Sequence, residues 1–396
     1  MGSIAKYLAL EGNIRVMAVQ TLVSGLGFGM FYVIWQPLIL HTGVSVVGLG
    51  VIQSVMNLST AAGLITWGVL SDRYGRKPVI LLSQACRLLS MVALVVSGDF
   101  AFLLLYAFLM GFSAQFMIGN PARSALVSES VEDQSRATAF STLMSISQIT
   151  STVMASAGGY IAMTRGYGPI LYTCVAVDII SLLLLTLYLR ETREPTAVEA
   201  RHAEGLVAML KDLFMPEPGI GRLYLMLLVM GLGYGTGYSL LYGILVDSYG
   251  FTVLQLGFMS TAFNLTWGVL SIPIGKISDR VGRKPMLMAS WTAAVITVLG
   301  FLAFRSFEAF LVINMISALD PALWIPAWMA LLAEKIPSDR LSTVMGKIDA
   351  YSKLAGIPAP WIGGILYSTY GFTAPLVVHF VCLMIAGFLI FSLKEK

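Results

Sequence analysis

Charged residues are scarce in this chain. Only 12% of its 396 residues are Asp, Glu, Lys or Arg, whereas 57% are hydrophobic. A soluble domain carries about twice that share of charged residues. A water-soluble fold cannot cover so much apolar surface, so the composition excludes a soluble protein and predicts an integral membrane protein.

Cysteine and histidine are also rare. The three cysteines all lie in apolar runs, which favours packing over a disulfide or metal framework. The three histidines are scattered, and the chain contains no metalloprotease, serine-hydrolase or phosphate-loop motif. These absences argue against an enzyme, and they predict neither a metal nor a cofactor.

Two further signals are missing. The first 15 residues hold Lys6, Glu11 and Arg15 and no central apolar run, so we expect no cleavable signal peptide, with the first span as its own insertion signal. The formal charge of +4 comes from short loops, which predicts no nucleic-acid partner.

Long apolar runs fill most of the chain, each near the 20 or so residues that a membrane-spanning helix needs. We place twelve spans at 14–40, 46–70, 77–97, 100–126, 137–163, 168–189, 222–247, 252–276, 285–304, 307–333, 341–369 and 372–393. The predicted domains are therefore an N-terminal six-helix bundle (1–190), a cytoplasmic linker (191–221) and a C-terminal six-helix bundle (222–396). Leu206, Leu210 and Leu213 in the linker have helical spacing, and both an interfacial helix and a solvated linker remain open.

Lysine and arginine are distributed unevenly between the two sets of loops. Nearly all of them share a side with the N-terminus, whereas the opposite loops hold only Arg165 and Arg305. The positive-inside rule then places both termini in the cytoplasm, in a multi-pass protein of the cell membrane surrounded by lipid.

One charged stretch occurs twice. Residues 68–78 read GVLSDRYGRKP, and residues 275–285 read GKISDRVGRKP. Gly75 and Gly282 allow a tight reversal, and Pro78 and Pro285 suit the first turn of a helix. Each copy therefore predicts a short charged turn between two spans.

The two halves repeat beyond this stretch. Residues 25–29 (GLGFG) match 231–235 (GLGYG), and Pro121 and Glu129 match Pro326 and Glu334. The pattern G-x-L-x-D-R-x-G-R-K resembles the loop between helices 2 and 3 of the major facilitator superfamily. The resemblance implies an all-α fold of twelve transmembrane helices in two pseudo-symmetric bundles, and transport by alternating access.

The same resemblance implies that the charged loops latch the cytoplasmic side when the cavity faces outward. Arg76 can reach Glu129, and the repeat predicts that Asp72 faces the start of the eleventh span near Leu341 and Ser342. By symmetry Asp279 faces Ala137 and Thr138. The candidate cytoplasmic gate comprises Asp72, Arg73, Arg76, Glu129, Asp279, Arg280, Arg283 and Glu334. The alternative is that these loops only set the topology.

Charges inside the spans are the most informative residues, because each costs a few kcal/mol or more at the bilayer centre. Arg87 in the third span and Asp178 in the sixth lie about 15 Å deep at 1.5 Å per residue. The superfamily uses these two spans to support the bundle from outside. We therefore predict a structural buried pair.

A second group of charges lies in the tenth and eleventh spans. Asp349 and Lys353 are four residues apart and share a helix face, and Asp320 lies halfway along its span. Gln115 and Gln148 are the first-half counterparts of Asp320 and Lys353. The predicted substrate and coupling site comprises Gln115, Gln148, Asp320, Lys347, Asp349 and Lys353. A purely structural knot of salt bridges is the alternative.

The sequence departs from the resemblance at two motifs of drug–proton antiporters. Met154 and Ala155 replace a glycine–proline pair in the fifth span, and Ala107 replaces an arginine in the fourth. We therefore expect a monomeric secondary active transporter of a small charged or amphipathic organic solute, coupled to protons. Uncoupled or sodium-coupled exchange, a multidrug efflux antiporter and a non-transporting receptor or scaffold are the alternatives.

Overall fold

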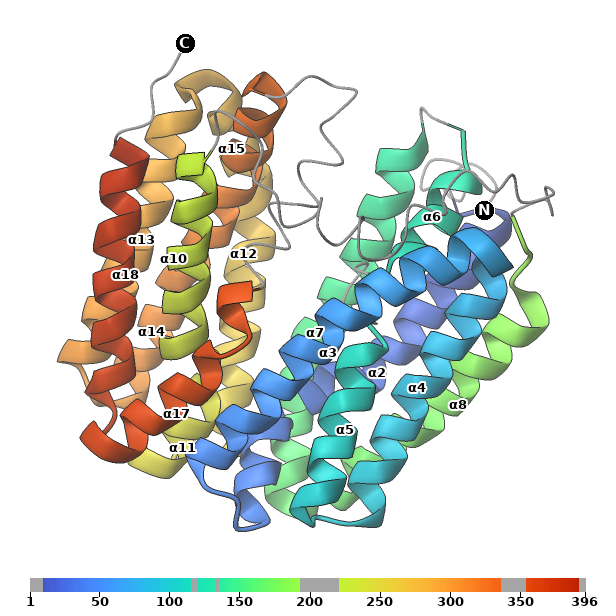
Figure 1. The fold of residues 1–396 in the computed structure, drawn as a ribbon, viewed down its shortest axis with the longest axis horizontal. Coiled ribbons are helices and arrows are strands. Elements are labelled where there is room, and N and C mark those ends of the chain that lie inside the picture. The colour runs from blue at the N-terminus through green and yellow to red at the C-terminus, as the bar shows by residue number, and fades with distance from the viewer. Residues whose placement is uncertain (1–9, 115–119, 133–134, 193–220, 336–353, 392–396) are drawn as a thin grey trace. The chain divides into compact units, whose positions relative to one another are not determined.

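The computed structural model describes residues 10–114, 120–132, 135–192, 221–335 and 354–391 (Figure 1). All regular structure within these residues is helical, so the all-α prediction is confirmed. Nine of the described helical stretches are long and apolar enough to cross a membrane.

Each of the twelve predicted spans contains a described helix. The first six hold α2 (Gly12–His41), α3 (Val46–Tyr74), α4 (Arg76–Val96), α5 (Phe100–Phe112) with α6 (Pro121–Glu129), α7 (Arg136–Arg165) and α8 (Gly168–Tyr188). The last six hold α10 (Gly221–Gly237) with α11 (Leu241–Tyr249), α12 (Val253–Val281), α13 (Arg283–Ala303), α14 (Phe307–Ser317) with α15 (Leu319–Lys335), α17 (Ala359–Tyr370) and α18 (Thr373–Phe391).

Several spans expected to be continuous are interrupted. A turn at 238–240 separates α10 from α11, and Ala318 separates α14 from α15. Pro321 accounts for the second break, because it has no N–H to donate to the carbonyl of Ser317 and its ring crowds that carbonyl. Asp320 therefore lies beside a helix irregularity, which its apolar surroundings in the sequence did not indicate.

The chain divides into two compact units. The first holds 1–43 and 55–199, and the second holds 44–54 and 200–396. The opening turns of α3 thus belong to the second unit, whereas the rest of α3 belongs to the first. The predicted domain boundaries near 190 and 221 stay a prediction.

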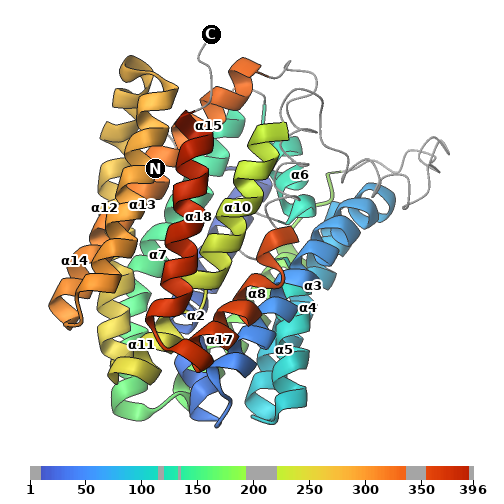
Figure 2. The same cartoon turned by 60° about the vertical axis from the view of Figure 1, so that its left-hand side comes forward.

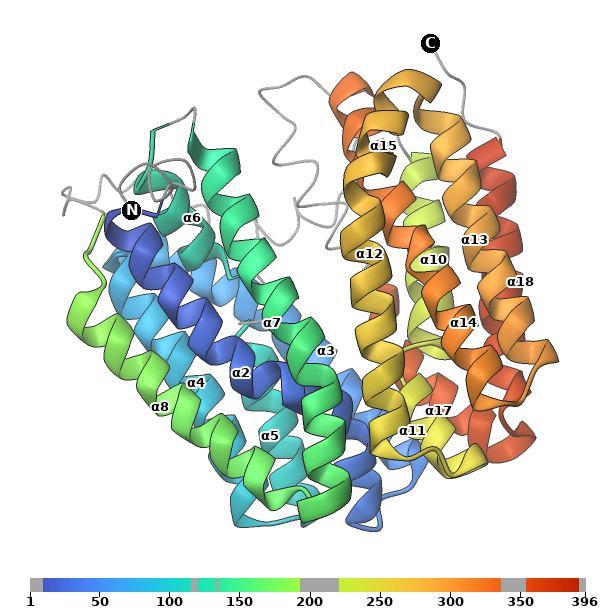
Figure 3. The same cartoon turned by 180° about the vertical axis from the view of Figure 1, so that it is seen from behind.

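The same neighbours recur in both units. In the first, α2 packs on α7 and α8, and α4 packs on α5 and α8, as Figure 3 shows. In the second, α10 packs on α17 and α18, and α13 packs on α14, α15 and α18 (Figure 2). The sequence repeat is therefore also a repeat of helix packing.

Glycines at matching positions permit the closest of these contacts. A Cβ on Gly27 of α2 would lie 2.5 Å from Cγ2 of Val177 on α8. A Cβ on Gly233 of α10 would lie 2.6 Å from Cβ of Cys382 on α18. Small residues let membrane helices approach so closely that their backbones nearly touch, and the first helix of each unit uses glycine for this purpose.

Candidate functional site

The two charged turns have the same backbone. Gly75 between α3 and α4 has φ 98°, and Gly282 between α12 and α13 has φ 94°. A side chain is strained at such angles, so glycine permits each reversal. Lys77 donates to the carbonyl of Thr186 at 2.9 Å, and the equivalent Lys284 donates to that of Phe391 at 3.1 Å. Each turn is thereby tied to the last helix of its own unit.

Arg76 joins two carboxylates at the first turn. Its guanidinium lies 2.6 Å from Oδ1 of Asp72 and 2.8 Å from Oε1 of Glu129, and it also donates to Oγ of Ser71. The predicted contact between Arg76 and Glu129 is therefore present. Asp72 is 69% exposed on its side chain. Arg73 stands 5.6 Å from the ring of Tyr74.

Glu191 is a further member of this cluster that the sequence did not indicate. Its two carboxylate oxygens accept from the backbone N–H groups of Arg76 and Lys77, each at 2.9 Å. Both N–H groups lie in the first turn of α4, where a helix has no partners of its own for them. In the sequence Glu191 follows the sixth predicted span in a polar stretch, which predicted a linker.

Glu129 is held ionised by its surroundings. Partial burial raises the pKa of its carboxyl, but the hydrogen bonds from Arg76 and from the hydroxyl of Thr192 outweigh that effect, so the pKa lies below its ordinary value. The negative charge of Glu129 is thus available to Arg76 throughout the neutral range.

The second copy of the cluster is described only in part. Asp279 and Arg280 lie in the last turn of α12 and Glu334 in α15, but their side chains are outside the described part of the chain. The same holds for Leu341 and Ser342, so the expected positions of Asp72 and Asp279 across from other helices stay predictions.

Arg87 and Asp178 are brought together inside the first unit. Nε of Arg87 on α4 lies 3.2 Å from Oδ1 of Asp178 on α8, and their side chains are 7% and 1% exposed. The amide of Gln84 donates to the same oxygen at 3.2 Å, and the ring of Phe28 lies 5.4 Å from the guanidinium. The predicted contact is present, whereas its purely structural role stays a prediction.

Two further buried polar residues of the first unit were not singled out from the sequence. Arg123 on α6 is 7% exposed and donates to the hydroxyl of Thr21 on α2 at 3.3 Å. Gln20 on α2 is fully buried, and neither end of its amide has a hydrogen-bond partner among the described residues. Arg123 lies inside the predicted fourth span, close to its end at residue 126, but was not counted among the charges inside the spans. A single glutamine in an apolar helix carries little signal.

Of the two acids in the predicted coupling site, Asp320 is the one that lies in the described part of the chain. Its Oδ1 accepts a short hydrogen bond from the hydroxyl of Ser290 on α13. No ion pair between described residues involves Asp320. Gln148 is half-buried on α7. Gln115, Lys347, Asp349 and Lys353 lie outside the described residues, so their meeting with Asp320 stays a prediction.

The first unit has a matching contact. Ser83 on α4 corresponds to Ser290 on α13, and it accepts from the amide of Asn120 at 2.9 Å while donating to the carbonyl of Ser113. Asn120 also caps α6, where it accepts from the backbone of Ala122. In both units a serine of the third span therefore binds a polar residue beside the break in the fourth span of that unit.

A polar contact also crosses the break between α10 and α11. The hydroxyl of Tyr238 lies 3.1 Å from Oδ1 of Asn314 and 3.3 Å from Oγ of Ser317 on α14. The rings of Tyr234 and His379 pack against Tyr238. His379 is buried. No cluster of three or more metal-ligating side chains occurs among the described residues.

Two repeated bundles of membrane-length helices, with matched charged turns and acids inside the spans, are the architecture of a polytopic transport protein. The family described as Major Facilitator Superfamily matches residues 17–242 and again 223–396. The chain belongs to this superfamily and is a membrane transporter of that class.

Individual known proteins match the chain at low sequence identity. The chain is 25% identical over 335 residues to "Multidrug resistance protein MdtG" of Enterobacter lignolyticus, covering 83% of this chain and 78% of that one. It is 25% identical over 354 residues to "Multi-drug resistance efflux pump PmrA" of Streptococcus pneumoniae, covering 84% of each. A crystal structure of the nucleoside transporter NupG superposes with a TM-score of 0.75 at 12% identity, over 96% of this chain and 98% of that one. That structure shows the shared fold alone.

Proposed function

We propose that the chain is a proton-coupled secondary transporter that moves a small charged or amphipathic organic solute by alternating access. It works as a monomer in the cell membrane, with both termini in the cytoplasm and lipid as its surroundings. The printed names of MdtG and PmrA favour multidrug efflux as a second candidate, although Met154, Ala155 and Ala107 replace residues of the antiporter motifs.

The observation that carries proton coupling is the environment of Asp320. It lies halfway along the α14–α15 stretch, and its described partner is the neutral hydroxyl of Ser290. An ionised carboxylate at this depth costs several kcal/mol unless a cation or a proton neutralises it. A proton bound in one conformation and released in the other would couple its movement to that of the solute.

The test is transport in liposomes under an imposed pH gradient, with a panel of fluorescent organic cations and anions as solutes. We expect the unaltered protein to accumulate at least one solute in response to the gradient. Asp320→Asn should keep solute binding but lose the response, because the amide cannot carry a proton. Asp99→Asn is the matched control, since Asp99 is an exposed acid just before α5. If Asp320→Asn responds to the gradient as the control does, Asp320 does not carry the coupling proton.

The charged turns supply the gate in this proposal. Arg76 holds Asp72, whose side chain is 69% exposed, and in this proposal Asp72 faces a helix end of the other bundle when the cavity faces outward. Asp72→Asn should raise cytoplasmic accessibility of the cavity, measured by cysteine labelling. Unchanged labelling in Asp72→Asn and Asp279→Asn would leave the turns with a role in topology alone.

A further inference from the structure

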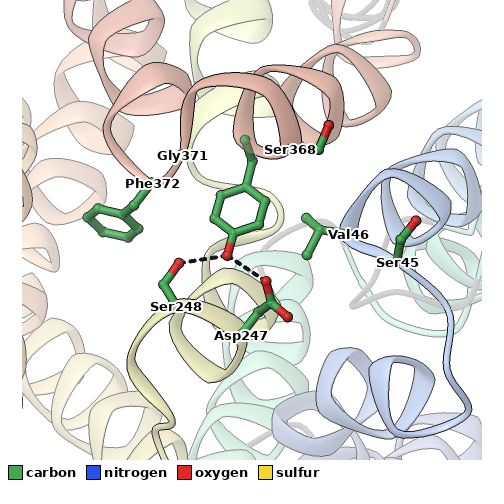
Figure 4. A pocket seen from close by; sticks show the side chains of 8 residues that line it. Ser45, Val46, Asp247, Ser248, Ser368, Gly371 and Phe372 are labelled. Carbon is green, nitrogen blue, oxygen red and sulfur yellow. Dashed lines mark hydrogen bonds between the residues drawn. The ribbon is translucent and has the colours of Figure 1, made fainter.

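A second polar site lies in the second unit, at the end opposite to the Gly282 turn. The last turn of α11, the last turns of α17 and the residues that open α3 line an open cavity of about 420 Å³ (Figure 4). This is within the usual size range of sites for small organic ligands. The residues that decide its chemistry are Ser45, Asp247, Ser248, Tyr367, Ser368 and Phe372.

A chain of hydrogen bonds runs toward Asp247. The hydroxyl of Tyr367 donates to Oδ2 of Asp247 at 2.5 Å, and Oγ of Ser248 lies 2.7 Å from the same hydroxyl (Figure 4). Tyrosine has one hydroxyl hydrogen, and the carboxylate takes it. The hydroxyl of Ser248 must therefore donate to Tyr367, so the Ser248 oxygen can only accept a hydrogen bond from a ligand.

The other serines add to this pattern. The hydroxyl of Ser368 donates to the carbonyl of Ile365 at 2.9 Å, so it too presents only lone pairs to the cavity. Oγ of Ser45 accepts from the backbone N–H of Gly48 at 3.3 Å. Among the four hydroxyl groups of the wall, Ser45 is the one whose hydrogen is left to donate to a ligand. Three of the four hydroxyl hydrogens in the wall are thus already used, and the cavity offers acceptors.

The cavity also carries negative charge. Asp247 is the ionisable acid in its wall, and no ion pair between described residues involves it. Arg305 stands 5.6 Å from the ring of Phe372, but its guanidinium donates to the carbonyls of Phe301 and Phe304. The carboxylate charge is therefore open to a ligand.

We propose that this cavity binds the primary ammonium group of a small organic amine. An ammonium supplies a positive charge for Asp247 and three N–H donors for an acceptor-rich wall. The apolar part of the amine lies against the ring of Phe372. A single carboxylate is too few ligands for a calcium or magnesium site. The claim that the protein transports this amine rests on the proposed function, whereas the claim that the amine binds here does not.

The test uses the full chain in nanodiscs of phosphatidylcholine, a lipid without net charge. The probe is para-fluorophenethylammonium, and binding is followed by fluorine NMR at constant salt. We expect it to bind more tightly than its trimethylammonium analogue, which has the charge but no donors. The neutral para-fluorophenylethanol should bind more weakly still, and para-fluorophenylpropanoate should not compete.

Variants then locate the site. Asp247→Asn should weaken binding of the probe about tenfold, the loss expected for one charge-assisted hydrogen bond. Glu308→Gln is the matched control, because it removes an exposed acid at the start of α14 in the same unit. It should bind as the unaltered protein does. Tyr367→Phe keeps the carboxylate and should retain binding.

Three results would each overturn the proposal. The first is an amine that binds no more tightly than the alcohol, which the unaltered protein decides even if Asp247→Asn does not fold. The second is equal weakening by Asp247→Asn and Glu308→Gln, and the third is displacement of the probe by sodium at equal concentration. The assay needs no pH gradient, so loss of coupling in Asp320→Asn and loss of binding in Asp247→Asn are separate outcomes.

Discussion

Replacing one member of the Arg87–Asp178 pair should destabilise the first unit more than replacing both. Asp178→Leu leaves a buried guanidinium beside the ring of Phe28, and Arg87→Leu leaves a carboxylate that keeps the amide of Gln84. A carboxylate can take up a proton, but a guanidinium cannot lose one. We therefore expect Asp178→Leu to cost more than Arg87→Leu.

The distance between the charges sets the magnitude. At 3.2 Å and an effective dielectric constant of 20, the attraction between unit charges is about 5 kcal/mol. Removing one partner of a buried pair typically costs about 3–5 kcal/mol, whereas an apolar replacement of both is often close to neutral. The double variant Arg87→Leu/Asp178→Leu should therefore be more stable than Asp178→Leu alone, with a coupling free energy of about 3 kcal/mol in the cycle.

The assay is reversible unfolding of purified protein in detergent, applied to the parent, both single variants and the double variant. Asp99→Leu on the Arg87→Leu background provides the control cycle, because Asp99 is exposed and outside the pair. Additive losses in the Arg87–Asp178 cycle would refute the reasoning. Transport by a stable double variant would further support a structural role, whereas a folded but inactive one would assign the pair to transport.

Three further predictions concern single residues. Gly27→Ala should destabilise the protein by about 1–3 kcal/mol, because the added methyl group overpacks against α8. Gly268→Ala has nothing within 4 Å of its added Cβ and should stabilise α12 by up to about 1 kcal/mol. Thermal unfolding of the two variants compares these effects. The pKa of Glu129 is lowered in the folded protein. The contribution of Glu129 to stability is therefore present above about pH 4.3 and is lost as the pH falls through the lower native pKa. Glu129→Gln should remove that part of the pH dependence of the free energy of unfolding. Tyr238→Phe should cost about 1–2 kcal/mol because Asn314 loses a partner, and an unchanged denaturation midpoint would mean that the contact contributes nothing.

Sequence periodicity and composition determined the membrane class, the helices and the internal repeat. These features are local, because a span needs only a long apolar run and a turn needs only glycine between charges. The turns at Gly75 and Gly282 follow directly from residues a few positions apart. The contact of Arg87 with Asp178 was also predictable, since two opposite charges at one depth have few other partners in a bilayer.

The tertiary structure alone decided which distant polar groups meet. Glu191 caps α4 from 115 positions away, and Tyr367 meets Asp247 across 120 positions. No periodicity records such pairings, because they depend on which helix ends the packing brings side by side. The break beside Asp320 has a local cause instead, because Pro321 cannot donate to the carbonyl of Ser317, although the apolar run around it predicted an unbroken span. Local sequence therefore set the helices and turns of this transporter, whereas helix packing set the environments of its charged residues.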